Sequence, residues 1–308
     1  MAARVQLYST IEYNANGGNN APSNTVDVTL ADVGSGMNYV YVRTSYGVPT
    51  RSGYSFVNWK YTQYGVDYYA VGGTEVTFQY SVGGGIQYDQ YKTVTMYAQW
   101  QILVTEPTIT TQPSSKSVYR GDSTSVNISA TTAYGTLSYQ WQSSVNGSTW
   151  SNISGATSNT YSPSTSTVGV TYFRCVVTST AGGQSKTSTS ASASVTVNAT
   201  PIANITQQPQ DATVFVGSTS TVSVSATGNS LAYQWEQSAD GTNFTAISGA
   251  TSSSYTYPTS SVGEKYYRCY ITNTLNGYTA STYSNAAKIT VQSVSAPVFT
   301  QHPQGQVV

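Results

Sequence analysis

The stretches that decide the fold are SYQWQSS (residues 138–144) with TYFRCVVTST (171–180), and AYQWEQS (232–238) with KYYRCYITNT (265–274). In each pair the tryptophan precedes the cysteine by 34 residues, Trp141 before Cys175 and Trp235 before Cys269. The second pair follows the first at a constant shift of 94 residues. Because self-similarity at a fixed period marks a repeated structural unit, we interpret the two pairs as equivalent parts of homologous modules.

Shorter repeats set the limits of these modules. TTQPSSKSV around Pro113 recurs as TQQPQDATV around Pro209, and TQHPQGQVV around Pro303 begins a further copy. The predicted organisation is therefore a distinct N-terminal β-rich module at 1–103, two homologous modules at 104–199 and 200–293, and the start of a third at 294–308.

Composition favours an all-β protein. The 308 residues include 45 Ser, 46 Thr and 27 Tyr, and the hydrophobic fraction of 38% suffices for several small cores. Short alternating runs such as SVNISA and LSYQWQ are separated by turn signals, of which Asn146-Gly147 and Asp240-Gly241 are the clearest. No segment has a 3.6-residue apolar stripe, so we expect an antiparallel sandwich in each repeat and no long helix.

The Trp and Cys landmarks make the two repeats resemble immunoglobulin-like domains of the bacterial and phage kind. That resemblance implies that the tryptophan lies on strand C and the cysteine on strand F. The inter-sheet disulfide of the family needs a second cysteine on strand B, where this sequence has Ile128 and Val222. The bridge is therefore expected to be absent, with both cysteines as buried apolar thiols. Tyr267, two residues before Cys269, fits the tyrosine corner of the family, whereas Phe173 lacks the hydroxyl.

The N-terminal module carries three other landmarks, which are IEYNANGGNNAP (11–22), PTRSGYSFVNW (49–59) and TVTMYAQW (93–100). Together they resemble the Listeria-Bacteroides repeat, a β-grasp-like module of bacterial surface proteins. Residues 24–47 and 61–90 exceed a minimal repeat, so we expect extra strands or loops there and no helix. Phe56, Trp59, Tyr97 and Trp100 are candidate core residues.

Across the chain, the residues predicted to form the structural core are Trp59, Trp100, Trp141, Cys175, Trp235 and Cys269.

Catalytic chemistry is poorly supported. The single histidine, His302, lies in the incomplete third repeat, so no Ser-His-Asp or Cys-His arrangement can be assembled around a folded core. A pair of carboxylates can hydrolyse glycosides without histidine, and the N-terminal module offers five candidates, which we interpret as surface groups in turns and exposed strands: Asp27, Asp32, Asp67, Glu75 and Asp89. Two isolated cysteines do not make a zinc site, and no DxDxDG loop for calcium occurs. We expect no cofactor and no enzymatic activity.

Charge and hydropathy argue against two further kinds of interaction, with nucleic acids and with membranes. Twelve Lys and Arg balance twelve Asp and Glu, and only 8% of the residues are charged. A nucleic-acid partner is not expected, because phosphate binding needs clustered cations. Membrane insertion is not expected either, because no run of 18 apolar residues occurs.

Tyrosine is concentrated in the N-terminal module, with 14 of the 27 residues. Its rigid apolar face and polar tip suit contacts with proteins and sugars, although packing of the module could also account for the cluster. The candidate contact surface consists of Tyr61, Tyr64, Tyr68, Tyr69, Tyr88 and Tyr91.

Three functional hypotheses follow. The first is a phage decoration or fibre protein on the virion surface, whose N-terminal domain docks on capsid or tail proteins and whose other domains weakly bind cell-surface or mucosal glycans; the intact Met1 without an export signal favours it. The second is a fragment of a bacterial cell-surface adhesin or stalk. The third is a set of accessory modules of a secreted glycoside hydrolase. Association into a homo-oligomer is a further hypothesis.

Overall fold

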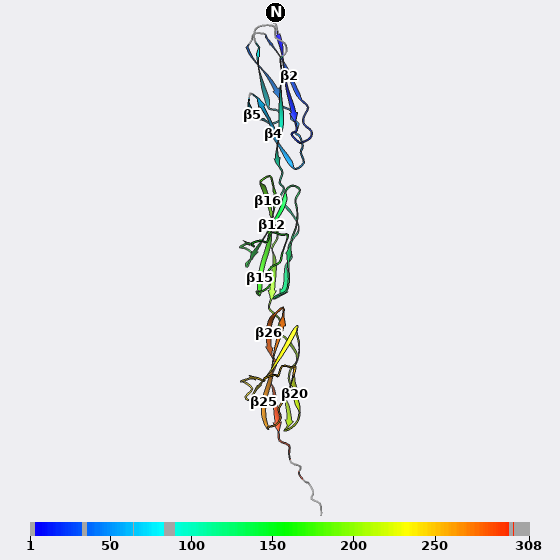
Figure 1. The fold of residues 1–308 in the computed structure, drawn as a ribbon, viewed down its shortest axis with the longest axis vertical. Coiled ribbons are helices and arrows are strands. Elements are labelled where there is room, and N and C mark those ends of the chain that lie inside the picture. Colours follow the sequence, from blue (N-terminus) through cyan, green and yellow to red (C-terminus); the bar gives the residue numbers. More distant parts are fainter. Residues whose placement is uncertain (1–3, 33–35, 64, 83–89, 296–297, 299–308) are drawn as a thin grey trace, which may run out of the picture. The chain divides into compact units, whose positions relative to one another are not determined.

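The computed structural model describes residues 4–32, 36–63, 65–82, 90–295 and 298. These residues form β-strands joined by turns and loops, and none of them is helical, as the all-β prediction requires. Figure 1 shows the strands grouped into separate bodies along the chain.

The N-terminal module contains a five-stranded sheet in the order β2-β1-β7-β4-β5 and a separate antiparallel pair, β3 with β6. Its strands are β1 (Arg4–Asn14), β2 (Thr25–Asp32), β3 (Gly36–Arg43), β4 (Tyr54–Gln63), β5 (Val66–Ala70), β6 (Glu75–Val82) and β7 (Gln90–Ile102). Strands β1 and β7 run parallel at the centre of the sheet, and the other pairs are antiparallel. The segments 24–47 and 61–90, where extra strands or loops were expected, contain β2, β3, β5 and β6.

The core of this module lies between the large sheet and the β3–β6 pair. Trp59 of β4 and Met96 of β7 are fully buried there against Phe78 of β6. Trp100 is partly buried against the same cluster, and its indole Nε1 donates to the carbonyl oxygen of Ala15 at 3.0 Å.

The prediction that Tyr97 belongs to the core is wrong. Successive side chains of a strand point to opposite faces, and Met96 and Ala98 occupy the inward positions of β7. Tyr97 therefore points outward and is 46% exposed.

The first repeat folds as a sandwich of one large sheet and an opposing layer of short strands. Its strands are β8 (Thr108–Thr111), β9 (Lys116–Tyr119), β10 (Val126–Asn127), β11 (Ser129–Thr131), β12 (Thr136–Ser144), β13 (Ser151–Asn152), β14 (Thr160–Tyr161), β15 (Gly169–Ala181), β16 (Gln184–Thr189) and β17 (Ala193–Asn198). The large sheet has the order β13-β12-β15-β17-β9, with β16 also paired to β15. The short pairs β11–β8 and β10–β14 make up the opposing layer.

The second repeat has the same architecture. Its strands are β18 (Asn204–Gln207), β19 (Ala212–Phe215), β20 (Ser220–Ser223), β21 (Ser225–Thr227), β22 (Ser230–Ser238), β23 (Thr245–Ala246), β24 (Ser254–Tyr257), β25 (Gly263–Leu275), β26 (Tyr278–Tyr283) and β27 (Ala287–Gln292). The order β19-β27-β25-β22-β23, with β26 on β25, reproduces the large sheet of the first repeat. The tryptophan strand β22 thus pairs with the cysteine strand β25, with Trp235 opposite Cys269.

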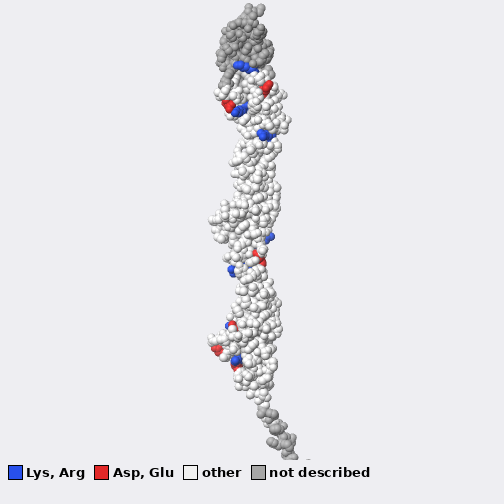
Figure 2. Space-filling view, in the orientation of Figure 1, with Lys and Arg blue, Asp and Glu red and all other residues white. Residues whose placement is uncertain are grey.

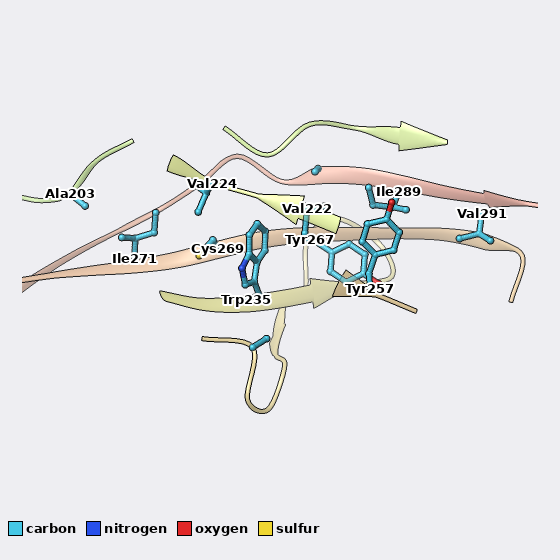
Figure 3. Packing of buried hydrophobic residues seen from close by; sticks show 12 residues of the cluster. Ala203, Val222, Val224, Trp235, Tyr257, Tyr267, Cys269, Ile271, Ile289 and Val291 are labelled. Carbon is cyan, nitrogen blue, oxygen red and sulfur yellow. The ribbon is translucent and has the colours of Figure 1, made fainter. Parts of the chain in front are cut away.

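Figure 3 shows how the core of the second repeat is filled. Trp235 lies between the two layers, beside Cys269 of β25 and below Val222 and Val224 of the opposing layer. Trp235 and Cys269 are both 0% exposed. The indole Nε1 donates to the carbonyl oxygen of Ser252 at 2.9 Å, so the one polar atom of this buried ring is satisfied.

No disulfide joins the layers of either sandwich, because both cysteines are free and buried. Ile128 and Val222, at the positions where a bridging cysteine would stand, are 1% and 2% exposed. An apolar side chain therefore fills the space of the missing partner. Burial removes water from the two thiols and raises the pKa of Cys175 and of Cys269 to about 11 in each case.

The structure bears on two further expectations, the tyrosine corner at Tyr267 and the start of a third module. Tyr267 is buried, and its burial raises its pKa to about 12, but no hydrogen bond of its hydroxyl is found within the described part of the chain. The bond that defines a tyrosine corner is therefore not seen there. The expected start of a third module, 294–308, lies outside the described residues except for 294, 295 and 298.

Replacing Trp235 by Ala should destabilise the second repeat by about 3 to 5 kcal/mol, because the change leaves a large cavity and removes the bond to Ser252. Differential scanning calorimetry of the full chain measures the effect. Val262→Ala, at a position that is 61% exposed, is the matched control and should change stability by less than about 0.5 kcal/mol. An unchanged unfolding profile in Trp235→Ala would contradict the core assignment.

Both thiols should resist a disulfide reagent such as Ellman's reagent in the folded protein near pH 8, because a thiol with a pKa near 11 has very little thiolate and these two are shielded from the reagent. In urea, two thiols per chain should react promptly. Fast reaction of either thiol in the native protein would show that its burial is wrong.

Candidate functional site

The candidate tyrosine surface of the N-terminal module divides between the two faces of its sheet. Tyr61 on β4 lies opposite Tyr68 on β5, and the two rings stack with centroids 5.2 Å apart. Tyr61 packs against the core, and its burial raises its pKa. Tyr68 is 41% exposed at the end of this stack. Tyr64 and Tyr88 lie outside the described residues, and Tyr91 lies on β7 with its side chain undescribed.

Tyr69 belongs to the outer face, where it is 60% exposed. The register places it opposite Lys60 of β4, and Lys60 lies opposite Tyr97 of β7. Neighbouring strands are about 4.8 Å apart, so the two tyrosines stand about 10 Å apart on either side of Lys60. Lys60 Nζ forms an ion pair with Asp67 Oδ2 at 2.7 Å, and this contact lowers the pKa of Asp67.

Of the carboxylates considered for catalysis, the two whose side chains are described form separate ion pairs. Asp67 forms the ion pair with Lys60, and Glu75 forms an exposed ion pair with Arg43 at 3.2 Å. Asp27 and Asp32 lie on β2 with undescribed side chains, and Asp89, like His302, lies outside the described residues. Within the described ranges, no group of three or more His, Cys, Asp or Glu side chains could hold a metal ion.

The outer face of the second sandwich carries a cluster centred on Arg268. Because strands alternate, the residues next to buried Trp235 and Cys269 point outward, and these residues are Glu236 and Arg268. Arg268 Nε forms an ion pair with Glu236 Oε2 at 2.8 Å. The guanidinium carbon lies 4.1 Å from the ring centroid of Phe244 and 4.0 Å from that of Tyr283.

A tight turn positions Phe244 for this contact. Ser238 Oγ accepts hydrogen bonds from the backbone nitrogens of Asp240 and Gly241, and Asp240 Oδ1 accepts from those of Thr242 and Asn243. Gly241 has φ +73°, a conformation that favours glycine, as the Asp-Gly signal predicts. The backbone donors of Asn243 and Thr242 hold the pKa of Asp240 far below its ordinary value.

The first sandwich repeats the cluster with different partners. Its turn is built in the same way, with Asn146 Oδ1 accepting from the backbone nitrogens of Ser148 and Thr149. Trp150 follows, and the guanidinium carbon of Arg174 lies 4.4 Å from its ring centroid. Arg174 Nε donates to Gln142 Oε1 at 2.7 Å, where the second sandwich has a carboxylate.

Sequence reasoning missed these clusters. A signal was present, since Arg174 and Arg268 precede the two cysteines at the same 94-residue shift. Trp150 and Phe244 come from the turn after the tryptophan strand, however, and Tyr283 comes from β26. Nothing in a linear pattern shows that these segments lie over the arginine.

Few charges accompany the clusters on the surface. Figure 2 shows most of the described surface on the displayed face as uncharged, with isolated Lys, Arg, Asp and Glu side chains. No helix that could cross a bilayer occurs in the ranges that the structure describes.

The two sandwiches, with a buried tryptophan on one strand and a buried cysteine on its neighbour, define a protein with tandem immunoglobulin-like domains. Residues 108–199 and 205–293 each match the family described as Domain of unknown function (DUF8696), and the chain belongs to this family. No curated protein matches the sequence.

Solved structures similar to this chain also contain tandem immunoglobulin domains. The N-terminal Ig1-2 module of Drosophila Receptor Protein Tyrosine Phosphatase DLAR is 19% identical, with 61% of this chain and 100% of that chain covered and a TM-score of 0.23. The titin domains z1z2 in complex with telethonin are 18% identical, with 63% and 100% covered and a TM-score of 0.32. Sidekick-1 immunoglobulin domains 1-5 are 17% identical, with 96% and 60% covered and a TM-score of 0.27.

Asp240→Asn should reduce the loss of stability of the second repeat in acid. A carboxylate whose pKa is lowered by folding contributes stability above its unfolded pKa of about 4, and this contribution is lost as the pH falls below that value. Asparagine keeps the acceptor oxygen of the turn, as Asn146 does, but cannot titrate. Urea unfolding followed by NMR signals of residues 200–293, at about pH 7 and about pH 3, measures the difference.

Asn146→Asp is the reciprocal variant and should introduce an acid-sensitive component into the first repeat. Equal pH dependence of the wild type and Asp240→Asn would show that the turn does not lower the pKa of Asp240.

Proposed function

We propose that the chain is a non-enzymatic structural and adhesion protein on the surface of a phage particle, as a decoration or fibre protein. Its N-terminal module docks on other proteins of the particle, and its immunoglobulin-like modules weakly contact glycans of a host surface or of mucus. The observation that carries this proposal is the tandem pair of sandwich modules of one family, a domain type that fits a structural or adhesive role.

The surfaces of the sandwich modules support the adhesive part. Their outer strands expose hydroxyl and amide side chains, as in β16, where Gln184, Ser185, Thr187 and Thr189 are exposed beside Lys186. Each outer face adds one arginine stacked on an aromatic ring. Such surfaces form many weak polar contacts, and several copies on one particle can multiply weak affinities by about two orders of magnitude or more.

The N-terminal module supports the docking part. Tyr69 and Tyr97 expose large rings on the outer face of the five-stranded sheet, and tyrosine is enriched where protein surfaces meet. The parallel central pair β1 and β7, flanked by antiparallel strands, agrees with a β-grasp-like module and so with the resemblance to the Listeria-Bacteroides repeat. That resemblance also suits the alternative proposal of a bacterial cell-surface adhesin.

Electron microscopy with gold-labelled antibodies against residues 1–103 and against residues 200–293 tests the location. Purified phage particles should be labelled by the antibody against 200–293, whereas docking should hide part of 1–103. Labelling of bacterial envelopes alone, with none on particles, would reject the virion proposal in favour of the adhesin.

The same particles test the docking face. Tyr69→Ser with Tyr97→Ser should lower the amount of chain incorporated into particles, because both rings leave the proposed contact. Tyr119→Ser, at a 44% exposed tyrosine of the first sandwich, is the matched control and should leave incorporation unchanged. Circular dichroism of each variant checks that it folds.

A further inference from the structure

The two sandwiches hold the same arginine in different surroundings. In the second sandwich, Phe244 and Tyr283 contact the guanidinium of Arg268, and Glu236 neutralises its charge. The side chains of Arg268 and Glu236 are only 28% and 15% exposed. The residues of this cluster therefore neutralise and cover the guanidinium of Arg268, and little of it is left to contact a ligand.

The cluster of the first sandwich lacks two of these partners. At the 94-residue shift, Gln142 stands in the place of Glu236 and Thr189 in the place of Tyr283. The registers agree, since Thr189 lies opposite Val176 on β15 as Tyr283 lies opposite Tyr270 on β25. Threonine has no ring with which to cover a guanidinium.

Arg174 consequently keeps an uncompensated charge. Its Nε donates a hydrogen bond to Gln142, and one face of its guanidinium lies on the ring of Trp150. No carboxylate in the described part of the chain forms an ion pair with it. Its terminal nitrogens form no hydrogen bond with the described residues. Gln142 is itself held in place, because its Nε2 donates to Asn152 Oδ1 at 2.9 Å. The guanidinium is therefore oriented before any ligand arrives.

We propose that Arg174, Trp150, Gln142 and Asn152 form a binding site for a carboxylate-bearing sugar of the uronic acid type. The carboxylate of the ligand takes the electrostatic role that Glu236 has in the second sandwich and binds the terminal guanidinium nitrogens in a two-pronged geometry. The partly exposed indole of Trp150 offers an apolar surface to the sugar ring. The side-chain amide of Asn152 is placed to bond sugar hydroxyls.

Charge complementarity selects an acidic ligand at this module. Residues 104–199 contain four cationic side chains and two acidic ones, whereas residues 200–293 contain three and four. The exposed groups around the site are hydroxyls and amides, such as Ser151 and Asn152, which match the hydroxyls of a sugar. The inference rests on the proposed adhesive function and narrows it to one ligand class and one module.

Titration of the full chain with trigalacturonic acid tests the site, with its methyl ester as the matched uncharged ligand. The indole NMR signal of Trp150, assigned through Trp150→Phe, should shift saturably with the acid. The ester should bind about tenfold more weakly or worse, because it cannot form the charge-assisted hydrogen bonds that a carboxylate forms with the guanidinium. Added salt should weaken the binding of the acid.

Variants that give each sandwich the arginine partners of the other test the site further. Gln142→Glu with Thr189→Tyr rebuilds the closed cluster of the second sandwich on the first and should lower the affinity for the acid about tenfold or more, with an unchanged circular dichroism spectrum. The converse pair, Glu236→Gln with Tyr283→Thr, should open the second sandwich and add a second binding event in calorimetry. Arg174→Lys should keep attraction but lose the two-pronged contact, and so bind more weakly than the wild type.

Equal binding of the acid and the ester, retained binding in Gln142→Glu with Thr189→Tyr, or no binding of the acid would each overturn the site. Tighter binding of oligoglutamate than of trigalacturonic acid would also overturn it, since the ligand class would then be an acidic peptide. If the chain binds neutral glycans but not the acid, the proposed adhesive function stands and only this site fails. If it binds no glycan at all and labels no particle, both fail.

Discussion

The buried indole at the centre of each sandwich is the interaction on which the rest of these modules depends. Trp235 fills the space between the layers and donates a hydrogen bond to Ser252, and Trp141 donates in the same way to Ser158, each at 2.9 Å. No disulfide spans the layers, so their attachment relies on packing around this ring. One large aromatic side chain buries more apolar surface than any aliphatic residue could at this position.

The same packing determines which side chains lie on the outer face of the sheet. A strand whose Trp235 points inward must point Glu236 outward, and a strand whose Cys269 points inward must point Arg268 outward. The core therefore fixes the base of the arginine cluster, and the Ser-x-Asp-Gly or Ser-x-Asn-Gly turn supplies the aromatic ring above it. Only the partners around the guanidinium differ between the modules. Differences of this kind leave the fold intact and change what the surface can bind.

The sequence predicted the sandwiches well, because their determinants are periodic and repeated. These determinants are local: the alternation around Trp141 and Trp235, the glycine turns, and the lack of a cysteine on strand B. The structure agrees with each of them, since both tryptophans are buried and both cysteines are free. The inward assignment of Tyr97 failed because aromatic character was given more weight than the alternation of β7, which already placed Met96 and Ala98 inside. The arginine clusters could not be predicted, since they join residues from three separate segments whose proximity arises only on folding. Function is harder to predict from the sequence than the fold, because a sandwich scaffold supports many unrelated binding surfaces.

Native-state hydrogen exchange of the indole Nε1–H groups of Trp141 and Trp235 tests the central role of these rings most directly. If each ring joins the two layers of its sandwich, its indole proton should exchange only through global unfolding of that module. The free energy of exchange and its dependence on urea should then equal those of unfolding measured on the same module. Exchange that is much faster than unfolding, or that does not depend on urea, would mean that the ring can leave the core while the sandwich stays folded, and would contradict this account.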